Sequence, residues 1–259
     1  MEKNNFLINY TTKLADAEEL NVEFYLKNWL PIPKGSITMI TAPGGSGKSY
    51  LSIQIALRMI LENKENRILL WNTEDAVGEM KKRSNKILKY ILKNEELDIS
   101  NIDVIDNSKL PVYFNDGNNK EFLEYFKKYN LIILDPLISF YSGEENNNSE
   151  ARRFMNLLNK IAINNNQSII IVHHHNKKDK EGNSRTRGAS AFVDAVRLLY
   201  EIQPLKNYKT LKKIEIAKDN KGVTFMVKND NFIIKVLPFK EPEEEKEKIG
   251  VENVGKLFG

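Results

Sequence analysis

The sequence predicts an α/β fold: a mostly parallel, twisted sheet flanked by helices and extended by antiparallel hairpin strands toward the C-terminal end. Three observations support this prediction. Between residues 36 and 172, short apolar or β-branched runs alternate with segments of helical periodicity. A glycine-rich turn joins the first run to the first helical segment. After about residue 195, strand candidates follow one another without helices between them.

The individual elements follow from these patterns. Strands are expected at residues 36–41, 67–71, 103–105, 112–114, 131–134 and 168–172, most of which are apolar runs of buried-strand length. Helices are expected at residues 49–62, 76–97, 121–129 and 149–164. Ser149 is expected to be the N-cap of the last helix. Residues 196–203, 211–217, 223–228 and 232–237 are expected to form the antiparallel strands.

Length and composition limit the kind of protein. The chain has 259 residues, no cysteine and a net charge of only +4. It is long enough to bury a large core without disulfides, and the missing cysteines fit a reducing compartment. No apolar run reaches the ~18 residues of a membrane span, and MEKNNFLINY at the start lacks a signal-peptide pattern. We therefore expect a cytoplasmic protein with no membrane partner.

The expected domain plan has three parts. Residues 1–30 mix polar and apolar residues without a clean period, which suggests an N-terminal arm. Residues 31–238 hold all the expected strands and helices and should form one α/β domain. Residues 239–259 form a C-terminal tail that contains the charge run KEPEEEKEK. The charge run is expected to be solvated.

A phosphate-binding loop is predicted at residues 42–49, APGGSGKS, between an expected strand and an expected helix. This is the Walker A arrangement, with Ala42 where the usual pattern has glycine. Gly44, Gly45 and Gly47 can adopt positive φ, so that backbone N–H groups point at phosphate oxygens. Lys48 can neutralise the β- and γ-phosphates, and the Ser49 hydroxyl can bind Mg²⁺. The expected nucleotide-binding residues are Ala42, Pro43, Gly44, Gly45, Ser46, Gly47, Lys48, Ser49 and Tyr50.

Two carboxylates are expected at the same edge of the sheet as the loop. Asp135 ends the apolar run at residues 131–134, where it can hold Mg²⁺ and its water shell. Glu74 follows the strand at residues 67–71 and can activate the water that attacks the γ-phosphate. Asp75 is the alternative to Glu74, although it could instead cap the next helix.

The ordered set of motifs resembles the RecA-like ATPases, in which an acid follows the strand after the P-loop helix. The residue after Asp135 is Pro136, which cannot act as a catalytic acid. Within that group the chain is most similar to the plasmid RepA type of hexameric replicative helicase. The segments that carry the resemblance lie at residues 42–49, 72–75, 134–140, 171–178, 185–190 and 217–222, within a similar region of about residues 25–237.

The resemblance implies a homo-oligomeric ring of six subunits, with ATP between neighbouring subunits and single-stranded DNA through the centre. An initiator or a primase would be a further partner. The function implied is an ATP-driven DNA helicase of plasmid or phage replication. Two alternatives remain: a KaiC-like or recombinase-like ATPase that does not unwind DNA, and a nucleotide-gated module that binds DNA or protein.

The resemblance also assigns roles to residues that follow the expected strand at residues 168–172. His174, in the run of histidines at residues 173–175, matches a residue that senses the γ-phosphate, while strand alternation should turn His173 to the opposite side. Zinc binding is disfavoured because no cysteine or further histidine is present to complete a site. The loop residues Lys177, Lys178, Lys180 and Arg185 match a pore loop and could contact DNA phosphates. The competing interpretation of the histidines is that they only cap the end of the strand. The competing interpretation of the basic loop is that it is a solvated surface loop.

Two cations match groups that act on the ATP of a neighbouring subunit. Arg187 matches an arginine finger, which would stabilise charge on the γ-phosphoryl group. Lys218 matches a lysine that also points to the neighbour's phosphates. Relatives of the DnaB type carry an arginine near Asn220, and this chain does not, which leaves Arg187 as the main candidate. A DNA-contacting or surface arginine is the competing interpretation.

Overall fold

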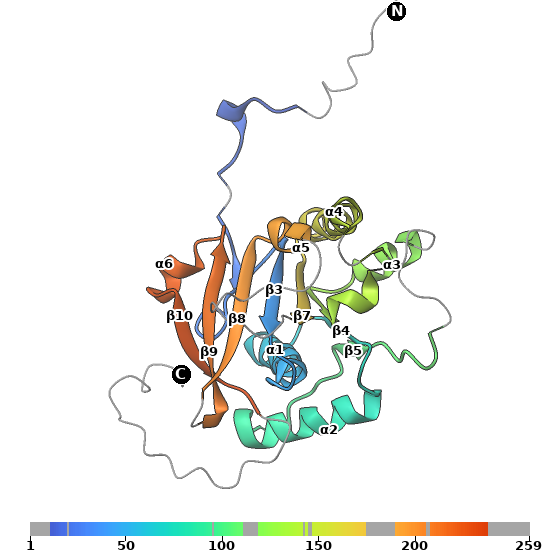
Figure 1. Ribbon diagram of the computed structural model, residues 1–259, viewed down its shortest axis with the longest axis vertical. Coiled ribbons are helices and arrows are strands. Elements are labelled where there is room, and N and C mark those ends of the chain that lie inside the picture. Colours follow the sequence, from blue (N-terminus) through green and yellow to red (C-terminus); the bar gives the residue numbers. More distant parts are fainter. Residues whose placement is uncertain are drawn as a thin grey trace, which may run out of the picture.

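The computed structural model describes residues 11–19, 21–94, 96–110, 119–141, 143–144, 147–174, 190–205 and 208–237. Within these residues an 8-stranded sheet has the order β10-β9-β8-β3-β7-β6-β4-β5 (Figure 1). All neighbours from β8 to β5 are parallel, and the β8–β9 and β9–β10 pairs are antiparallel. The predicted fold class, an α/β sheet with a C-terminal antiparallel extension, is therefore confirmed.

The strands lie close to their predicted positions. The parallel part consists of β3 (Ser36–Ala42), β4 (Ile68–Asn72), β5 (Ile102–Val104), β6 (Leu131–Asp135), β7 (Ser168–His174) and β8 (Leu198–Leu205). The antiparallel part adds β9 (Tyr208–Asp219) and β10 (Asn231–Lys235). Strands β3, β4 and β6 are buried along their whole length, as expected for the centre of a sheet covered on both faces.

Helices cover both faces of the sheet (Figure 1). One face carries α1 (Lys48–Glu62), α2 (Val77–Ile87) and the π-helical turn Leu88–Leu92. The other carries α3 (Asn119–Phe126), the 3₁₀ turn Leu137–Phe140, α4 (Asn148–Asn164) and α5 (Ser190–Ala195). The side chains of β4 alternate between the two cores, with Leu70 on the α1 side and Trp71 on the α4 side.

Part of the expected N-terminal arm packs against the domain. Strands β1 (Phe24–Tyr25) and β2 (Ile32–Pro33) pair with each other, and Leu26 and Leu30 are buried in the core on the α1 side. The Leu26 N–H donates to both carboxylate oxygens of Glu62 at the end of α1, each at 3.1 Å. The preceding 3₁₀ turn, Leu14–Asp16, stands away from the sheet (Figure 1).

Three local predictions are wrong. The helix expected at residues 76–97 ends as an α-helix at Ile87. Asn147, and not Ser149, caps α4, because its side-chain oxygen accepts the N–H groups of Ser149 and Glu150. Residues expected to form a strand at 223–228 instead form the short helix α6, Val223–Val227.

The reason for α6 lies in the residue that ends β9. Asp219 accepts hydrogen bonds from the backbone N–H groups of Gly222 and Thr224, each at 2.8 Å. These bonds satisfy the first donors of a helix and outweigh the β-branched composition of the segment. The strand expected at residues 112–114 and the tail at 239–259 lie outside the described residues. No described helix combines the length and the apolar character that a membrane crossing requires.

Candidate active site

The glycine-rich loop connects β3 to α1. Gly45 and Gly47 have φ values of 72° and 94°, in the left-handed region that glycine adopts without strain, whereas Gly44 lies outside that region. Ala42 is the last residue of β3 and is fully buried, so its methyl group fits where the usual motif has glycine. The Ser46 hydroxyl is buried without a hydrogen-bond partner among the described residues, which fits a ligand oxygen bound in the loop.

Lys48 lies at the base of this loop. Its side chain is buried, and its ammonium group donates to the backbone oxygens of Pro43 and Ala42 at 3.0 and 3.1 Å. Burial lowers the pKa of Lys48, while the negative charges of Asp135 and Glu74 oppose this change. A cation held between carbonyl oxygens and carboxylates is in a position to bind an anionic group in the loop.

Asp135 ends β6 directly opposite Asn72, the last residue of the parallel strand β4. Its carboxylate accepts from the Ser52 hydroxyl and from the Asn72 amide, both at 3.4 Å. Burial, reinforced by the nearby charge of Glu74, raises the pKa of Asp135 to about 6, although Lys48 and the Ser49 hydroxyl act in the opposite direction. A buried carboxylate beside a serine hydroxyl provides the oxygen ligands that Mg²⁺ prefers, so Asp135 and Ser49 fit this ion.

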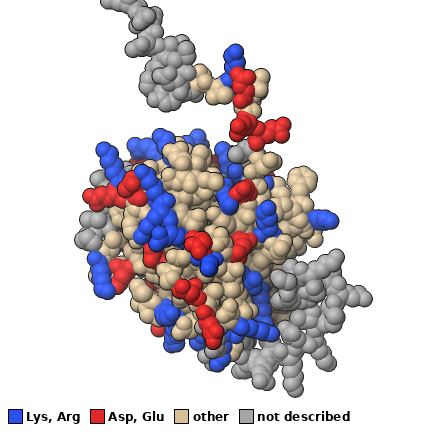
Figure 2. All heavy atoms as spheres, turned by 180° about the vertical axis from the view of Figure 1, so that it is seen from behind, with Lys and Arg blue, Asp and Glu red and all other residues tan. Residues whose placement is uncertain are grey.

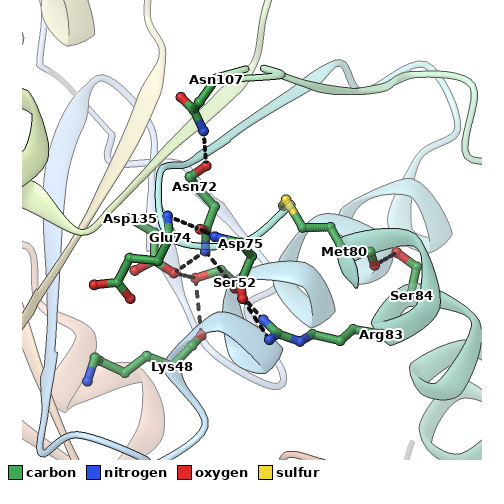
Figure 3. Close-up of polar contacts among 10 residues, drawn as sticks. All are labelled: Lys48, Ser52, Asn72, Glu74, Asp75, Met80, Arg83, Ser84, Asn107 and Asp135. Carbon is green, nitrogen blue, oxygen red and sulfur yellow. Dashed lines mark hydrogen bonds and ion pairs between the residues drawn. The ribbon is translucent and has the colours of Figure 1, made fainter. Parts of the chain in front are cut away.

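Glu74 and Asp75 follow β4, and their side chains diverge (Figure 3). The Asn72 side-chain oxygen accepts the N–H groups of Glu74 and Asp75 at 2.9 and 2.8 Å, which fixes the turn. The Glu74 side chain is 57% exposed, and its carboxylate lies 3.9 Å from His174 Nε2. Asp75 instead forms a two-pronged ion pair with Arg83 of α2. Of the two acids, only Glu74 is therefore directed toward Lys48 and His174.

The histidines of β7 alternate as predicted. His173 is buried, with its ring 6.2 Å from the Phe192 ring in the core on the α4 side. His174 ends the strand on the pocket side, beside Glu74. The sheet therefore brings the ends of β3, β4, β6 and β7 to one edge, as expected for parallel strands.

A pocket of about 210 Å³ brings together eight of the predicted residues. Its lining consists of Gly45, Gly47, Lys48, Ser49, Tyr50, Glu74, Asp75, Arg83, Asp135 and His174. Arg83 and Asn72 were not predicted from the sequence. The sequence did contain a signal for Arg83: it follows the apolar residue Met80 by three positions, and this spacing places both on the inner face of α2.

Lys218 lies elsewhere, in β9. Its ammonium group donates to the backbone oxygens of Val193 and Asp194 at 3.0 and 2.8 Å, at the C-terminal end of α5, and it does not line the pocket. A cation at a helix C-terminus is favourable in itself. The residues predicted to act beyond the pocket, Lys177, Lys178, Lys180, Arg185 and Arg187, lie outside the described residues.

The fold and the pocket together define an α/β domain with a P-loop at the carboxyl edge of its parallel strands. A family model described as an AAA domain matches residues 9–180, and the chain belongs to this family. The match includes the P-loop, Glu74, Asp135 and His174.

Solved structures share the fold. The RadB recombinase is similar with a TM-score of 0.54 and 15% identity, over 73% of this chain and 83% of the recombinase chain. The ATPase domain of another protein is similar with a TM-score of 0.56 and 14% identity, over 78% of this chain and 81% of that domain. At such identities the likeness concerns the fold alone. No curated protein is similar enough in sequence to count as a match.

Proposed function

We propose that this protein is a Mg²⁺-dependent ATPase that acts as a motor on single-stranded DNA, as a replicative helicase of a plasmid or phage. The observation that supports catalysis most directly is the pocket in which Lys48, Glu74, Asp135 and His174 meet at one edge of the sheet. The family and the RecA-like fold support an ATPase. The step from ATPase to helicase rests on the motifs shared with the RepA type.

Each residue of the pocket has a role in this proposal. The loop N–H groups and Lys48 hold the β- and γ-phosphates, and Ser49 and Asp135 hold Mg²⁺. Mg²⁺ bound there would neutralise negative charge on the phosphate oxygens. Glu74 orients the attacking water and accepts its proton, and the exposure of its side chain leaves room for that water. His174, beside Glu74, senses whether the γ-phosphate is present.

The proposal includes assembly as a homo-oligomeric ring, with six subunits as in the RepA type. Arg187 would reach the ATP of the neighbouring subunit, and the loop residues Lys177, Lys178, Lys180 and Arg185 would contact DNA in the pore. For Lys218 to reach a neighbour's phosphate, it would have to leave the carbonyl oxygens of Val193 and Asp194. Arg187 is therefore the better candidate for the finger.

The charge distribution suits a local DNA contact more than a broad one. On the face behind the view of Figure 1, basic and acidic side chains are interspersed (Figure 2). With a net charge of only +4, long-range attraction of DNA would be weak. DNA binding in this proposal therefore depends on a few cations presented by one loop.

The fold likeness to a recombinase keeps one alternative open: an ATPase that coats DNA or remodels a protein without unwinding. A nucleotide-gated binding module with weak turnover is the other. A cytoplasmic location is part of all three proposals, whereas an initiator or primase partner belongs to the helicase proposal alone.

Two assays test these possibilities. We expect ATP hydrolysis that rises when oligo-dT is added and is lost in Lys48→Ala, together with ATP-dependent strand displacement from a forked duplex. DNA-stimulated hydrolysis without displacement would favour the non-unwinding ATPase. Light scattering with and without an ATP analogue and oligo-dT would test the ring.

A further inference from the structure

A continuous chain of polar contacts connects helix α2 to the turn that carries Glu74. We call its three members, Asn72, Asp75 and Arg83, the Arg83 clamp (Figure 3). The two terminal nitrogens of the Arg83 guanidinium each contact a different carboxylate oxygen of Asp75, and the Nη2–Oδ1 distance is 2.7 Å. Paired bonds of this kind fix orientation as well as distance.

The clamp is shielded from water. The side chains of Arg83 and Asp75 are 9% and 18% exposed, so solvent weakens this ion pair less than it would a surface pair. The guanidinium carbon lies 5.3 Å from the centre of the Tyr50 ring, next to the P-loop. On the same inner face of α2, Met80 and Ile87 are buried in the core. Arg83 is thus anchored to a helix that is itself packed against α1.

Asn72 carries the constraint to the catalytic side. Its amide nitrogen donates to Asp75 Oδ2 at 3.2 Å and to Asp135 Oδ2 at 3.4 Å, while its side-chain oxygen holds the N–H group of Glu74. The Asn72 backbone oxygen in turn accepts from Asn107 at 2.6 Å. The turn that carries Glu74 is therefore held at both ends, by β4 on one side and by the Asp75–Arg83 pair on the other.

We propose that Arg83 is a positioning residue for hydrolysis, which acts through Asp75 to hold the Glu74 turn and to keep the second carboxylate away from the nucleotide. The proposal rests on the proposed ATPase function and on Glu74 as the group that activates water. Arg83 also lines the pocket, so the competing role is direct contact with a phosphate. The occupation of both terminal nitrogens by Asp75 favours the positioning role.

A double-mutant cycle of Asp75→Asn and Arg83→Met separates the two roles. If Arg83 acts through Asp75, each single variant lowers kcat, by up to about 100-fold for a misplaced catalytic group, and leaves the Kd for a fluorescent ATP analogue unchanged. The double variant is then no slower than the slower single variant. Arg83→Lys should recover part of kcat, because an ammonium keeps the charge but cannot form both bonds at once.

Lys82→Met is the matched control. Lys82 is the neighbour of Arg83 on α2, its side chain is exposed, and the substitution removes the same charge. We expect wild-type kcat and Kd for this variant. A thermal unfolding curve for every variant shows that each is folded, and Arg83→Lys and Asp75→Asn carry the test if Arg83→Met does not fold.

Three results would overturn the inference: multiplicative losses of kcat in the double variant, weaker analogue binding in Arg83→Met, or unchanged kcat in folded Arg83 variants. The first two would place Arg83 on the nucleotide itself. Lys48→Ala is measured in parallel. If Lys48→Ala still hydrolyses ATP, both the proposed function and the role of the clamp are refuted. If Lys48→Ala is inactive but the losses of kcat in the clamp variants multiply, only the role of the clamp is refuted.

Discussion

The Asn72 amide nitrogen lies 3.4 Å from the Asp135 carboxylate, because these two residues end neighbouring parallel strands in exact register. This contact ties the carboxylate proposed to hold Mg²⁺ to the turn that presents Glu74. The same alignment places Ala42 opposite His174 at the ends of β3 and β7. Strand register therefore assembles the pocket from segments that are far apart in the sequence.

Nucleotide binding and turnover should be separable by two substitutions. We expect Lys48→Ala to lose binding of a fluorescent ATP analogue, because Lys48 acts on phosphates in the ground state. Glu74→Gln should keep binding and lose turnover, because Glu74 acts on the attacking water. Steady-state kinetics and a binding titration measure both effects. Near-normal hydrolysis by Glu74→Gln would contradict the assignment of the base and make Asp75 the next candidate.

Asp135 should make the free protein less stable as pH rises. Its pKa is raised from 3.8 to about 6 in the folded protein, so between these values the folded state binds more protons than the unfolded state. The stabilisation is fully present below about pH 3.8 and is lost as pH rises through about 6. The difference corresponds to about 3 kcal/mol.

Asp135→Asn measures this effect, since asparagine resembles the protonated acid. In EDTA and without nucleotide, we expect the variant to be more stable than the wild type at pH 8 and nearly equal near pH 4, as measured by urea unfolding. Glu121→Gln, which removes an exposed carboxylate from α3, is the control and should show no such trend. Equal stability of wild type and Asp135→Asn at pH 8 would contradict the buried charge.

The parallel core could be predicted well from the sequence. The central residues of β3, β4, β6 and β7 are apolar or β-branched, which is typical of parallel strands buried on both faces of a sheet. Lys48, Glu74, Asp135 and His174 could then be placed at one edge, because they follow the carboxyl ends of such strands. The roles of these residues remain predictions.

What could not be predicted depends on side chains that bond to local backbone or to distant elements. Helix α6 forms because Asp219 accepts N–H groups that a strand would have presented differently, and composition alone favours a strand there. The Arg83 contact depends on how α2 is rotated about its axis, which residue patterns leave only partly determined. Asn147 was overlooked as a cap because neighbouring Asn148 and Ser149 are equally suitable by residue type.

The cap of α4 provides a direct stability test. Asn147→Ala should destabilise the protein by about 1 kcal/mol, because the N–H groups of Ser149 and Glu150 lose their acceptor. Ser149→Ala is the matched control, since Ser149 lies inside the helix and its side chain is not the cap. Urea unfolding of both variants measures the difference. A larger loss for Ser149→Ala than for Asn147→Ala would place the cap where the sequence alone suggested.

Arg187 should make hydrolysis depend on assembly. If it contributes its guanidinium to the ATP of a neighbouring subunit, Arg187→Ala still binds ATP and still assembles, but loses most turnover. Mixing Arg187→Ala with Lys48→Ala subunits should restore activity, because some interfaces then combine an intact P-loop with an intact finger. Fingers contribute about 10³–10⁵ in rate, so even partial rescue should exceed the background.

The mixing experiment first needs evidence of subunit exchange, which co-purification through a tag on one variant provides. Wild-type subunits mixed with Lys48→Ala give the reference for activity in a mixed ring. Confirmed mixed rings without rescue would mean that Arg187 acts within its own subunit or on DNA. Lys218 would then become the candidate for the trans role. Lys218→Met loses the bonds to Val193 and Asp194, so its stability is measured by thermal unfolding. A large loss of kcat in Lys218→Met protein that is still folded would support the trans role.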